Sequence, residues 1–510
     1  ASLILLSACA RRSDVLAAEP RNLTVQPVGQ SIGGREILAT IQARGRESRA
    51  NAKNLSAYSE IAALPATQEI LTGLVGKISA RLARLSTASN LVAAVGTPQV
   101  ESVLNAMIEF DSAGELRRSP SGELAALIVL RTTDQDHARL VKKFESFVKG
   151  RANNALRISR TRNWTVLDLE TREAKGRGST GGLLEKADEF LRSTNWIDLT
   201  ADLSKFGTKL QSSSGSISNQ LHLTVIPQGD SFRSEIHITS DRPYELELGS
   251  WDIPLNTIRD PLIGFTAVQG IGSWLQKQPV LRTMGLEKAP NQAFFWSQPY
   301  SAFAVSGAVP NEAPRAAIDS IVTNYLPTLN SALTPLGVGT FQMSTNQGIL
   351  MWRGLPIAVP YIRPAPDEHF LFGGLFPLAN LGSKAPPAEL MAQVTTRTNL
   401  LYYDWEITGE RLNQWRQISQ LISIVENRFN GDTNLLSERW LRNIQPKLGN
   451  CMTELSLTPP RERSFGRRSA IGFNSLELVS LARWLDPAYV KPSGKSASGK
   501  KSLVSPLPPN

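Results

Sequence analysis

Two carboxylates separated by a single residue are the clearest candidates for chemistry in this 510-residue sequence. Asp404 and Glu406 lie in NLLYYDWEITG, residues 399–409, where polar and apolar residues alternate as in a β-strand. Side chains two residues apart in a strand point the same way, about 6.6 Å apart. Inverting glycosidases hold their two carboxylates about 6.5–9.5 Å apart. The pair could therefore act as the acid and base of a glycan or cell-wall hydrolase.

The same segment also fits a purely structural strand that leads into a helix. Its apolar residues would face the core, its acidic residues would face solvent, and Thr408 is a suitable helix N-cap. The D-W-E resembles the end of the DxxDxDxE signature of one chitinase family, but Asn399 and Tyr402 stand at its earlier acidic positions. That family also needs a (β/α)8 barrel, which this order of elements does not predict. We favour the structural strand and keep the hydrolase as the alternative.

Two histidines form the second candidate group. The sequence LHLTVIPQGDSFRSEIHITS, residues 221–240, predicts a hairpin in which His222 lies directly opposite His237. Two imidazoles about 5 Å apart could bind a metal ion. A zinc site needs further ligands, and neither Glu235 nor Thr224 completes a recognisable set. We expect a solvated polar face here, without a metal or other cofactor.

The remaining candidates are weaker. Ser31 in GQSIG matches the nucleophile elbow of α/β-hydrolases, but that serine must follow several strands, so we expect a turn residue. VGQSIGGREI, residues 28–37, is similar to a segment of zinc carboxypeptidase domains, yet none of the four histidines belongs to an HxxE zinc motif. Asp367, Glu368 and His369 are adjacent, so in extended chain they cannot converge on one atom.

The N-terminal residues ASLILLSACARRSD indicate export. An apolar run followed by small residues is typical of the end of a signal peptide. Leu6-Ser7-Ala8-Cys9 resembles the bacterial lipobox, in which Cys9 is lipidated, whereas Ala8-Cys9-Ala10 fits ordinary signal-peptidase cleavage. We favour the lipobox and expect a protein held in the cell envelope, on the periplasmic side or at the outer membrane. No later stretch reaches the roughly 18–20 apolar residues of a membrane span.

The net charge indicates which classes of partner the protein could bind, and the cysteine content indicates the role of Cys451. The net charge of +10 comes from 55 basic and 45 acidic residues. The excess near the two ends would attract anionic lipid or cell-wall polymer, or would simply keep the chain soluble. No basic stripe is interleaved with aromatic residues, so we expect no nucleic-acid partner. Cys451, without a histidine or basic cluster beside it, is expected to be a buried apolar residue.

A strand, a helix and a hairpin recur three times along the chain. This order predicts an α+β fold, in which repeated strand–helix–hairpin modules form antiparallel sheets with helices packed on one face. The predicted boundaries are 1–20 for the signal remnant and lipoprotein tether, 21–60 for a strand–turn and flexible basic segment, 61–180 for the first module, 181–290 for a hairpin and connecting region, 291–385 for the second module, 386–486 for the third, and 487–510 for a disordered basic tail.

Several motifs in the last two thirds of the chain resemble a family of exported bacterial proteins with no assigned activity. They are WDIPLNTIRDPLIGFTAVQGIGSWL (251–275), APNQAFFW (289–296), MWRGLP (351–356), FLFGGLFP (370–377), NLLYYDWEITG (399–409) and QPKLGNC (445–451). The resemblance spans roughly residues 190–485 and implies an exported α+β protein, without any catalytic residue, cofactor or substrate. We therefore expect a non-enzymatic envelope lipoprotein whose sheets bind an envelope protein or polymer.

Overall fold

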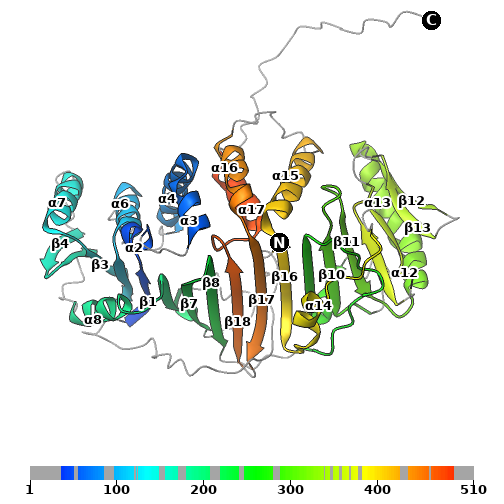
Figure 1. Cartoon of the computed structure of the whole chain (residues 1–510), viewed down its shortest axis with the longest axis horizontal. Coiled ribbons are helices and arrows are strands. Elements are labelled where there is room, and N and C mark those ends of the chain that lie inside the picture. The colour runs from blue at the N-terminus through cyan, green and yellow to red at the C-terminus, as the bar shows by residue number, and fades with distance from the viewer. Residues whose placement is uncertain are drawn as a thin grey trace, which may run out of the picture.

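The structure is a computed structural model of the chain. It describes residues 36–50, 55–85, 97–119, 122, 124–148, 156–169, 180–206, 219–240, 246–279, 288–337, 339–344, 348–354, 359–366, 369–376, 382–425, 435–458 and 461–486. Within these ranges, 18 strands form one sheet, with helices on both of its faces (Figure 1). A mixed α+β fold built on antiparallel strands was predicted, and this class is confirmed. The module boundaries drawn from the sequence stay a prediction.

Every neighbouring pair of described strands in the sheet is antiparallel. From one edge to the other the strands are β4 (Leu156–Thr161), β5 (Trp164–Leu169), β3 (Leu124–Arg131), β2 (Ser112–Arg118), β1 (Glu36–Ala43), β6 (Ile197–Asp202), β7 (Asn219–Gln228), β8 (Ser231–Ser240), β18 (Glu462–Ser469), β17 (Asn450–Thr458), β16 (Leu400–Ile407), β9 (Gly264–Gln269), β10 (Gln292–Ser297), β11 (Val305–Pro310), β15 (Phe370–Gly374), β14 (Tyr361–Pro364), β13 (Ile349–Arg353) and β12 (Thr340–Ser344). The sheet is therefore continuous from the first half of the chain to the second.

The two halves of the sheet share one connectivity. In the first half, β1 lies between β2 and β6, and β3 pairs with β5 of the following hairpin. In the second half, β9 lies between β10 and β16, and β11 pairs with β15 of the following hairpin. The final hairpins, β7–β8 and β17–β18, meet through antiparallel pairing of β8 with β18. The two halves therefore repeat one strand connectivity and meet at the β8–β18 pairing.

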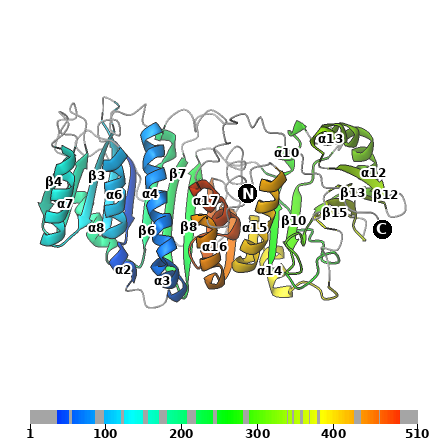
Figure 2. The same ribbon diagram turned by 90° about the horizontal axis from the view of Figure 1, so that it is seen from above.

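Most helices lie on one face of the sheet (Figures 1 and 2). These are α7 (Asp134–Val148), α6 (Thr97–Glu109), α4 (Pro65–Leu85), α3 (Ser56–Ala63), α16 (Leu436–Ile444), α17 (Ser475–Leu485), α15 (Thr408–Val425), α13 (Leu326–Leu333) and α12 (Pro314–Ser320). Two more, α8 (Gly181–Phe190) and α14 (Ala388–Thr395), lie on the opposite face (Figure 1). The short α2 (Arg46–Ala50) and α10 (Gly272–Leu275) follow β1 and β9. Helices thus pack on both faces, not on one.

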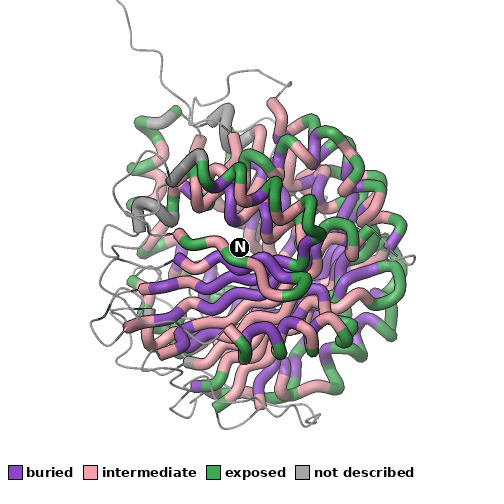
Figure 3. Tube along the Cα trace, turned by 90° about the vertical axis from the view of Figure 1, so that its left-hand side faces the viewer, coloured by how far each residue is buried: buried purple, intermediate pink, exposed green. Residues whose placement is uncertain are grey.

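Alternation along the strands explains the two helical layers. In β3, Ile128 and Leu130 pack against α6 and α7, whereas Leu127 and Val129 pack against α8. A strand buried on both faces therefore reads as a continuous apolar run, LAALIVL, instead of an alternating one. Buried residues are concentrated in the strands and on the helix sides that face them (Figure 3).

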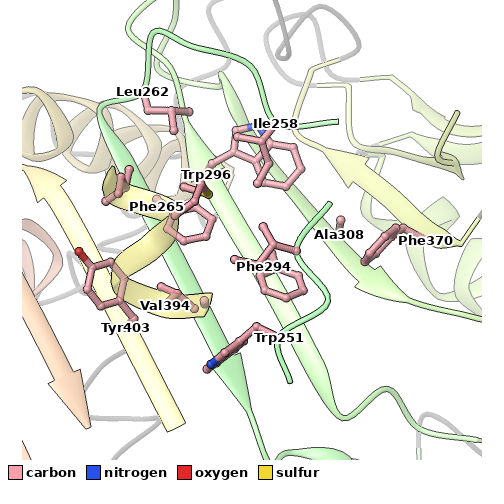
Figure 4. Packing of buried hydrophobic residues seen from close by; sticks show 14 of the residues in the cluster. Trp251, Ile258, Leu262, Phe265, Phe294, Trp296, Ala308, Phe370, Val394 and Tyr403 are labelled. Carbon is pink, nitrogen blue, oxygen red and sulfur yellow. The ribbon is translucent and has the colours of Figure 1, made fainter. Parts of the chain in front are cut away.

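The largest core cluster lies between the second half of the sheet and α14. Phe265 on β9 and Phe294 and Trp296 on β10 point toward this layer, together with Val394 of α14 (Figure 4). The Trp296 ring stacks on Phe372 with centroids 5.7 Å apart. Adjacent residues of β10 differ sharply, because Trp296 is 2% exposed and Phe295, on the other face, is 47% exposed.

The spacing of Thr133 and Asp136 in the sequence predicts a capping box at the start of a helix. The structure confirms it at the start of α7, where the Asp136 amide donates to Thr133 Oγ1 at 3.1 Å. For residues 156–169 the sequence predicts a hairpin with Leu156 and Ile158 opposite Trp164 and Val166. The hairpin forms, but that register is wrong, because Ile158 lies opposite Leu167. The turn of this hairpin consists of only two residues, 162–163, so Trp164 pairs with Thr161. Each later pair is set by this short turn, which moves Ile158 away from Trp164 and Val166.

We predict that Trp296→Ala and Phe295→Ala, changes at adjacent positions, have very different effects. Loss of the buried indole should lower the free energy of unfolding by about 3–5 kcal/mol, because a cavity remains in the core. Loss of the exposed Phe295 ring should change it by less than about 1 kcal/mol. Denaturant titration of both variants measures the difference, and equal effects would contradict the described placement of β10.

Candidate functional site

Asp404 and Glu406 lie on the face of β16 that is covered by α15 and α17. Their side chains are buried, with residue exposures of 9% and 4%. The alternation in residues 399–409 predicted a solvated strand face for them, and that prediction was wrong. The strand assignment itself was right, since residues 400–407 form β16. Alternation correctly puts both carboxylates on one face, but helices that follow later in the chain cover this face.

Glu406 binds the N-terminus of α17. Its Oε1 accepts a hydrogen bond from the Ser475 amide at 2.7 Å, and its Oε2 accepts one from the Ser475 hydroxyl at 2.5 Å. Ser475 is the first residue of the helix, where amides lack partners within the helix and a negative charge is favourable. Both carboxylate oxygens of Glu406 are therefore engaged in holding a helix end.

Asp404 connects β16 to β9 and faces α15. Its Oδ1 accepts a hydrogen bond from the Thr266 hydroxyl at 2.7 Å, across the strand pair that aligns these two residues. The half-buried Arg411 of α15 interacts electrostatically with both Asp404 and Glu406. Its guanidinium lies 4.9 Å from the centre of the Trp415 ring and donates to Gln414 Oε1 at 2.7 Å. One cation thus faces two carboxylates under the helical layer.

A second ion pair extends this cluster to β18. Arg467 donates to both carboxylate oxygens of Glu477, at 2.6 and 3.0 Å, and to Thr453 Oγ1 at 3.0 Å. Glu477 also accepts from the Asn474 amide and closes the capping box of α17. The buried charge cluster, defined as Asp404, Glu406, Arg411, Arg467 and Glu477, therefore ties strands β16 and β18 to helices α15 and α17.

The electrostatics of this cluster favour a protonated carboxyl group. Burial, followed by the charge of Asp404, raises the pKa of Glu406 to about 7, against the lowering effects of Ser475 and Arg411. Burial also raises the pKa of Asp404. It lowers the pKa of Arg411, although both neighbouring carboxylates oppose this shift. A carboxyl group with a pKa of about 7 is suited to general acid catalysis, but here it is hydrogen-bonded to a helix end.

The histidine pair lies on the other face of the sheet. His222 is aligned with His237 in the β7–β8 hairpin, so the predicted register is confirmed. His222 Nε2 lies 3.2 Å from Asp198 Oδ1 on β6, and His237 Nδ1 lies 2.7 Å from Glu462 Oε1 on β18. The hydrogen bond to Asp198 raises the pKa of His222. The two rings are held toward opposite neighbouring strands, and within the described residues no three His, Cys, Asp or Glu side chains could hold a metal ion.

These histidines belong to a larger polar surface on β6, β7, β8, β18 and β17. Side chains that alternate with the buried Phe465 and Leu455 and the partly buried Ile236 point to this side. No described helix covers this stretch of sheet between α8 and α14 (Figure 1). We define the central polar face as Asp198, Thr200, His222, Arg233, Glu235, His237, Thr239, Glu454, Glu462, Ser464 and Arg468.

Charges on the central polar face are paired locally. Arg233 contacts Glu235 at 2.5 Å, and Arg468 donates to the Ser231 hydroxyl at 2.9 Å. Arg233, Thr239 and Arg468 are exposed, and the two histidines are half-buried. The face is thus neither strongly acidic nor strongly basic, and it offers hydrogen-bond donors and acceptors over five adjacent strands.

The remaining sequence predictions concern Cys451, residues outside the described ranges and membrane-spanning segments. Cys451 is fully buried, as predicted, and burial raises the pKa of its thiol. Cys9, Ser31, Asp367 and Glu368 lie outside the described residues, so the lipidation site, the turn serine and the acidic part of 367–369 stay predictions. None of the helices in the described ranges has the length and apolar character required to cross a membrane.

Sequence reasoning missed the basic and hydroxyl partners of the acidic pair. Arg411, Arg467 and Ser475 are distant from one another in the sequence and form no recognisable motif. One signal was present: N-S-L-E at 474–477 has the spacing of a capping box, which the structure contains. It marks the start of α17, although it does not reveal that Glu406 reaches the same helix end.

No protein-family model matches the chain, and none of the curated proteins or solved structures gives a significant match. The resemblance to an exported bacterial family therefore rests on the sequence motifs alone. Any function must be argued from the buried charge cluster and the central polar face.

We predict that Glu406→Gln removes much of the pH dependence of stability. The folded protein retains a proton on Glu406 that the unfolded chain releases, because the pKa rises from 4.5 to about 7 on folding. The free energy of unfolding of the native sequence should therefore fall by about 3 kcal/mol as the pH rises through this window. Denaturant titrations at a series of pH values from 4 to about 8 measure this slope.

Ser475→Ala provides the matched control. It removes a donor to Glu406 but keeps the titrating carboxyl group, so the decline with rising pH should persist. A Glu406→Gln variant whose stability declines as steeply as that of the native sequence would show that another group titrates.

Proposed function

We propose that the protein is a non-enzymatic binding or structural module of the bacterial cell envelope, exported and anchored through lipid on Cys9. Its central polar face would contact an envelope protein or polymer. The observation that carries this proposal is the exposure of this face, across five strands, between two stretches of sheet covered by α8 and α14. Antiparallel sheets tolerate one solvated face, and a broad polar face of this kind can also bind a partner.

The chemistry of the face favours a polar partner with little net charge. Two arginines and two histidines accompany its four carboxylates, and its hydroxyl groups can both donate and accept hydrogen bonds. Five strands about 4.8 Å apart give a surface about 20 Å wide. Hydroxyl and amide groups of a glycan, or a polar protein surface, would match this arrangement.

The hydrogen bonds that Asp404 and Glu406 already accept within the protein support a non-enzymatic role. Catalysis would require a carboxyl group within hydrogen-bond reach of a substrate atom. Both oxygens of Glu406 already accept bonds from Ser475, and Asp404 accepts one from Thr266. A substrate could reach these groups only if α17 moved away from β16.

We predict that reversing two positive charges on the central polar face strongly reduces recovery of the envelope partner. The full-length protein carrying Arg233→Glu and Arg468→Glu should recover its envelope partner at least about tenfold less well, because two exposed positive groups become repulsive. Pull-down from intact envelopes, quantified for the partner that the native sequence retains, is the measurement.

The matched control reverses two exposed charges on the helical side, Lys142→Glu on α7 and Arg315→Glu on α12. Recovery should be unchanged in this variant. Equal recovery by both double variants would show that the central polar face is not the binding surface.

The alternative is a glycan or cell-wall hydrolase that uses Asp404 and Glu406. The raised pKa of Glu406 favours it, because a general acid must hold its proton near neutral pH. We expect the purified native protein to release no more sugar from cell-wall glycan than buffer does. Release that Asp404→Asn abolishes, with unfolding behaviour and localisation unchanged, would establish the hydrolase and refute our proposal.

A further inference from the structure

The two aligned histidines of the central polar face each contact a carboxylate on a strand outside their own hairpin. His237 Nδ1 on β8 lies 2.7 Å from Glu462 Oε1 on β18, and His222 Nε2 on β7 lies 3.2 Å from Asp198 Oδ1 on β6. The two rings are aligned with each other across the hairpin, but they bond in opposite directions. The β7–β8 hairpin is therefore bound on both sides through an imidazole.

One of these contacts crosses the junction between the two halves of the sheet. Among the described strands, β8 and β18 form the single pairing that joins the halves. The His237–Glu462 contact adds a side-chain bond to the main-chain hydrogen bonds of that pairing. The strength of this contact therefore affects how firmly the halves are joined.

The other carboxylates of the central polar face pair with arginines. Glu235 contacts Arg233 at 2.5 Å, and Glu454 contacts Arg397. Among the described residues, the two carboxylates that contact the histidines pair with no lysine or arginine. An arginine keeps its charge at every physiological pH, whereas a histidine loses its charge near neutral pH. Two of the four charge pairs on this face are therefore permanent, and two depend on a proton.

The nearest charges favour protonation of both rings. Two protonated imidazoles on aligned residues repel each other, with Cβ atoms about 4.5–5.5 Å apart. Each ring lies closer than this to a carboxylate oxygen, so the attraction outweighs the repulsion. The charged and titratable side chains that face the two rings are Asp198 and Asp202 on β6, Arg233 and Glu235 on β8, Glu462 and Arg468 on β18, and Glu454 on β17.

Protonation converts both contacts into ion pairs. A hydrogen bond between charged groups is roughly twice as strong as one between neutral groups. The hydrogen bond to Asp198 raises the pKa of His222 above its ordinary value of 6.5, and the charges of Asp198 and Glu235 add to this effect, although burial opposes it. The folded chain thus holds this proton more tightly than the unfolded chain. The resulting stabilisation is fully present below about pH 6.5 and is lost as the pH rises through the raised pKa.

We propose that His222 and His237 form a proton-dependent clamp, which ties β6 to β7 and β8 to β18 at mildly acidic pH and weakens as the pH rises above neutral. The clamp acts within the chain and needs no partner, so it goes beyond the proposed binding function. Both tests below use the purified full-length protein. A failure of the pull-down experiment would therefore leave the clamp standing, and a failure of these tests would leave the binding proposal standing.

The first experiment follows the imidazole resonances of the full-length protein by NMR during a pH titration. The sequence contains four histidines, and loss of one resonance in His222→Gln assigns that residue. Asp198→Asn should lower the measured pKa of His222 by about 0.5 or more, because the ring loses its charged acceptor. Glu454→Gln, which removes a carboxylate paired with an arginine, should leave this pKa unchanged. An unchanged pKa in Asp198→Asn, or an equal fall in Glu454→Gln, would overturn the clamp.

The second experiment measures the coupling between His237 and Glu462 in a double-mutant cycle of His237→Gln, Glu462→Gln and the double variant. Denaturant titrations at about pH 5.5 and about pH 8.5 sample the two sides of the histidine titration. The coupling should change the unfolding equilibrium constant about threefold or more at the lower pH and less than about 1.5-fold at the higher pH. All four chains carry Glu406, so its titration cancels in the cycle.

A cycle of Arg233→Gln and Glu235→Gln on the same face is the matched control. Its coupling should be equal at both pH values, because arginine keeps its charge. A His237–Glu462 coupling of equal size at both pH values, or none at the lower pH, would overturn the clamp. A control cycle that weakens equally at the higher pH would overturn it as well, since the change would then not come from histidine.

Discussion

The antiparallel pairing of β8 with β18 is the interaction on which the arrangement of the whole molecule depends. Among the described strands it is the single pairing that joins the first half of the sheet to the second. Its register runs from Phe232 opposite Ser469 to Thr239 opposite Glu462, and Ile236 packs beside Phe465 on the helical side. The polar side of the same pairing lies within the central polar face. One strand pair therefore supplies the junction of the halves and part of the surface proposed for binding.

The two halves carry different helices, and contacts between these helices stabilise the β8–β18 junction. The first half carries α3 and α4 in its β1–β2 connection, and the second carries α15 and α16 in its β16–β17 connection. These insertions meet across the dividing line, where Ile70 of α4 belongs to the same cluster as Trp440 and Leu478. The Trp440 indole donates to Thr67 Oγ1 at 3.0 Å. The two halves of the sheet thus share one strand connectivity but carry different helices among the described residues.

Local features of the fold were predictable from the sequence because they depend on neighbouring residues. Alternation in residues 221–240 fixed the His222–His237 register, and the cap at Thr133 marked the start of α7. The burial of Asp404 and Glu406 was not predictable in this way. Periodicity shows which side chains share a face of a strand, but the helix that covers Glu406 begins at Ser475, and its placement depends on tertiary packing. The repeated strand connectivity of the two halves was not predictable for the same reason, because strand pairing repeats while the sequence does not visibly repeat.

The buried charge cluster is best understood as a constraint on helix placement. A carboxylate removed from water costs several kcal/mol unless hydrogen bonds and an opposite charge compensate. Glu406 obtains its hydrogen bonds from the first residue of α17 and faces the cation Arg411 of α15, so both helices must lie in one position for the carboxylate to be satisfied. A shift of α17 by one residue would leave Glu406 unpaired and would separate Glu477 from Arg467. Apolar contacts alone tolerate such shifts better than paired charges do. The same residues that could suggest a catalytic acid and base are therefore sufficient to explain why α15 and α17 have a unique position on the sheet.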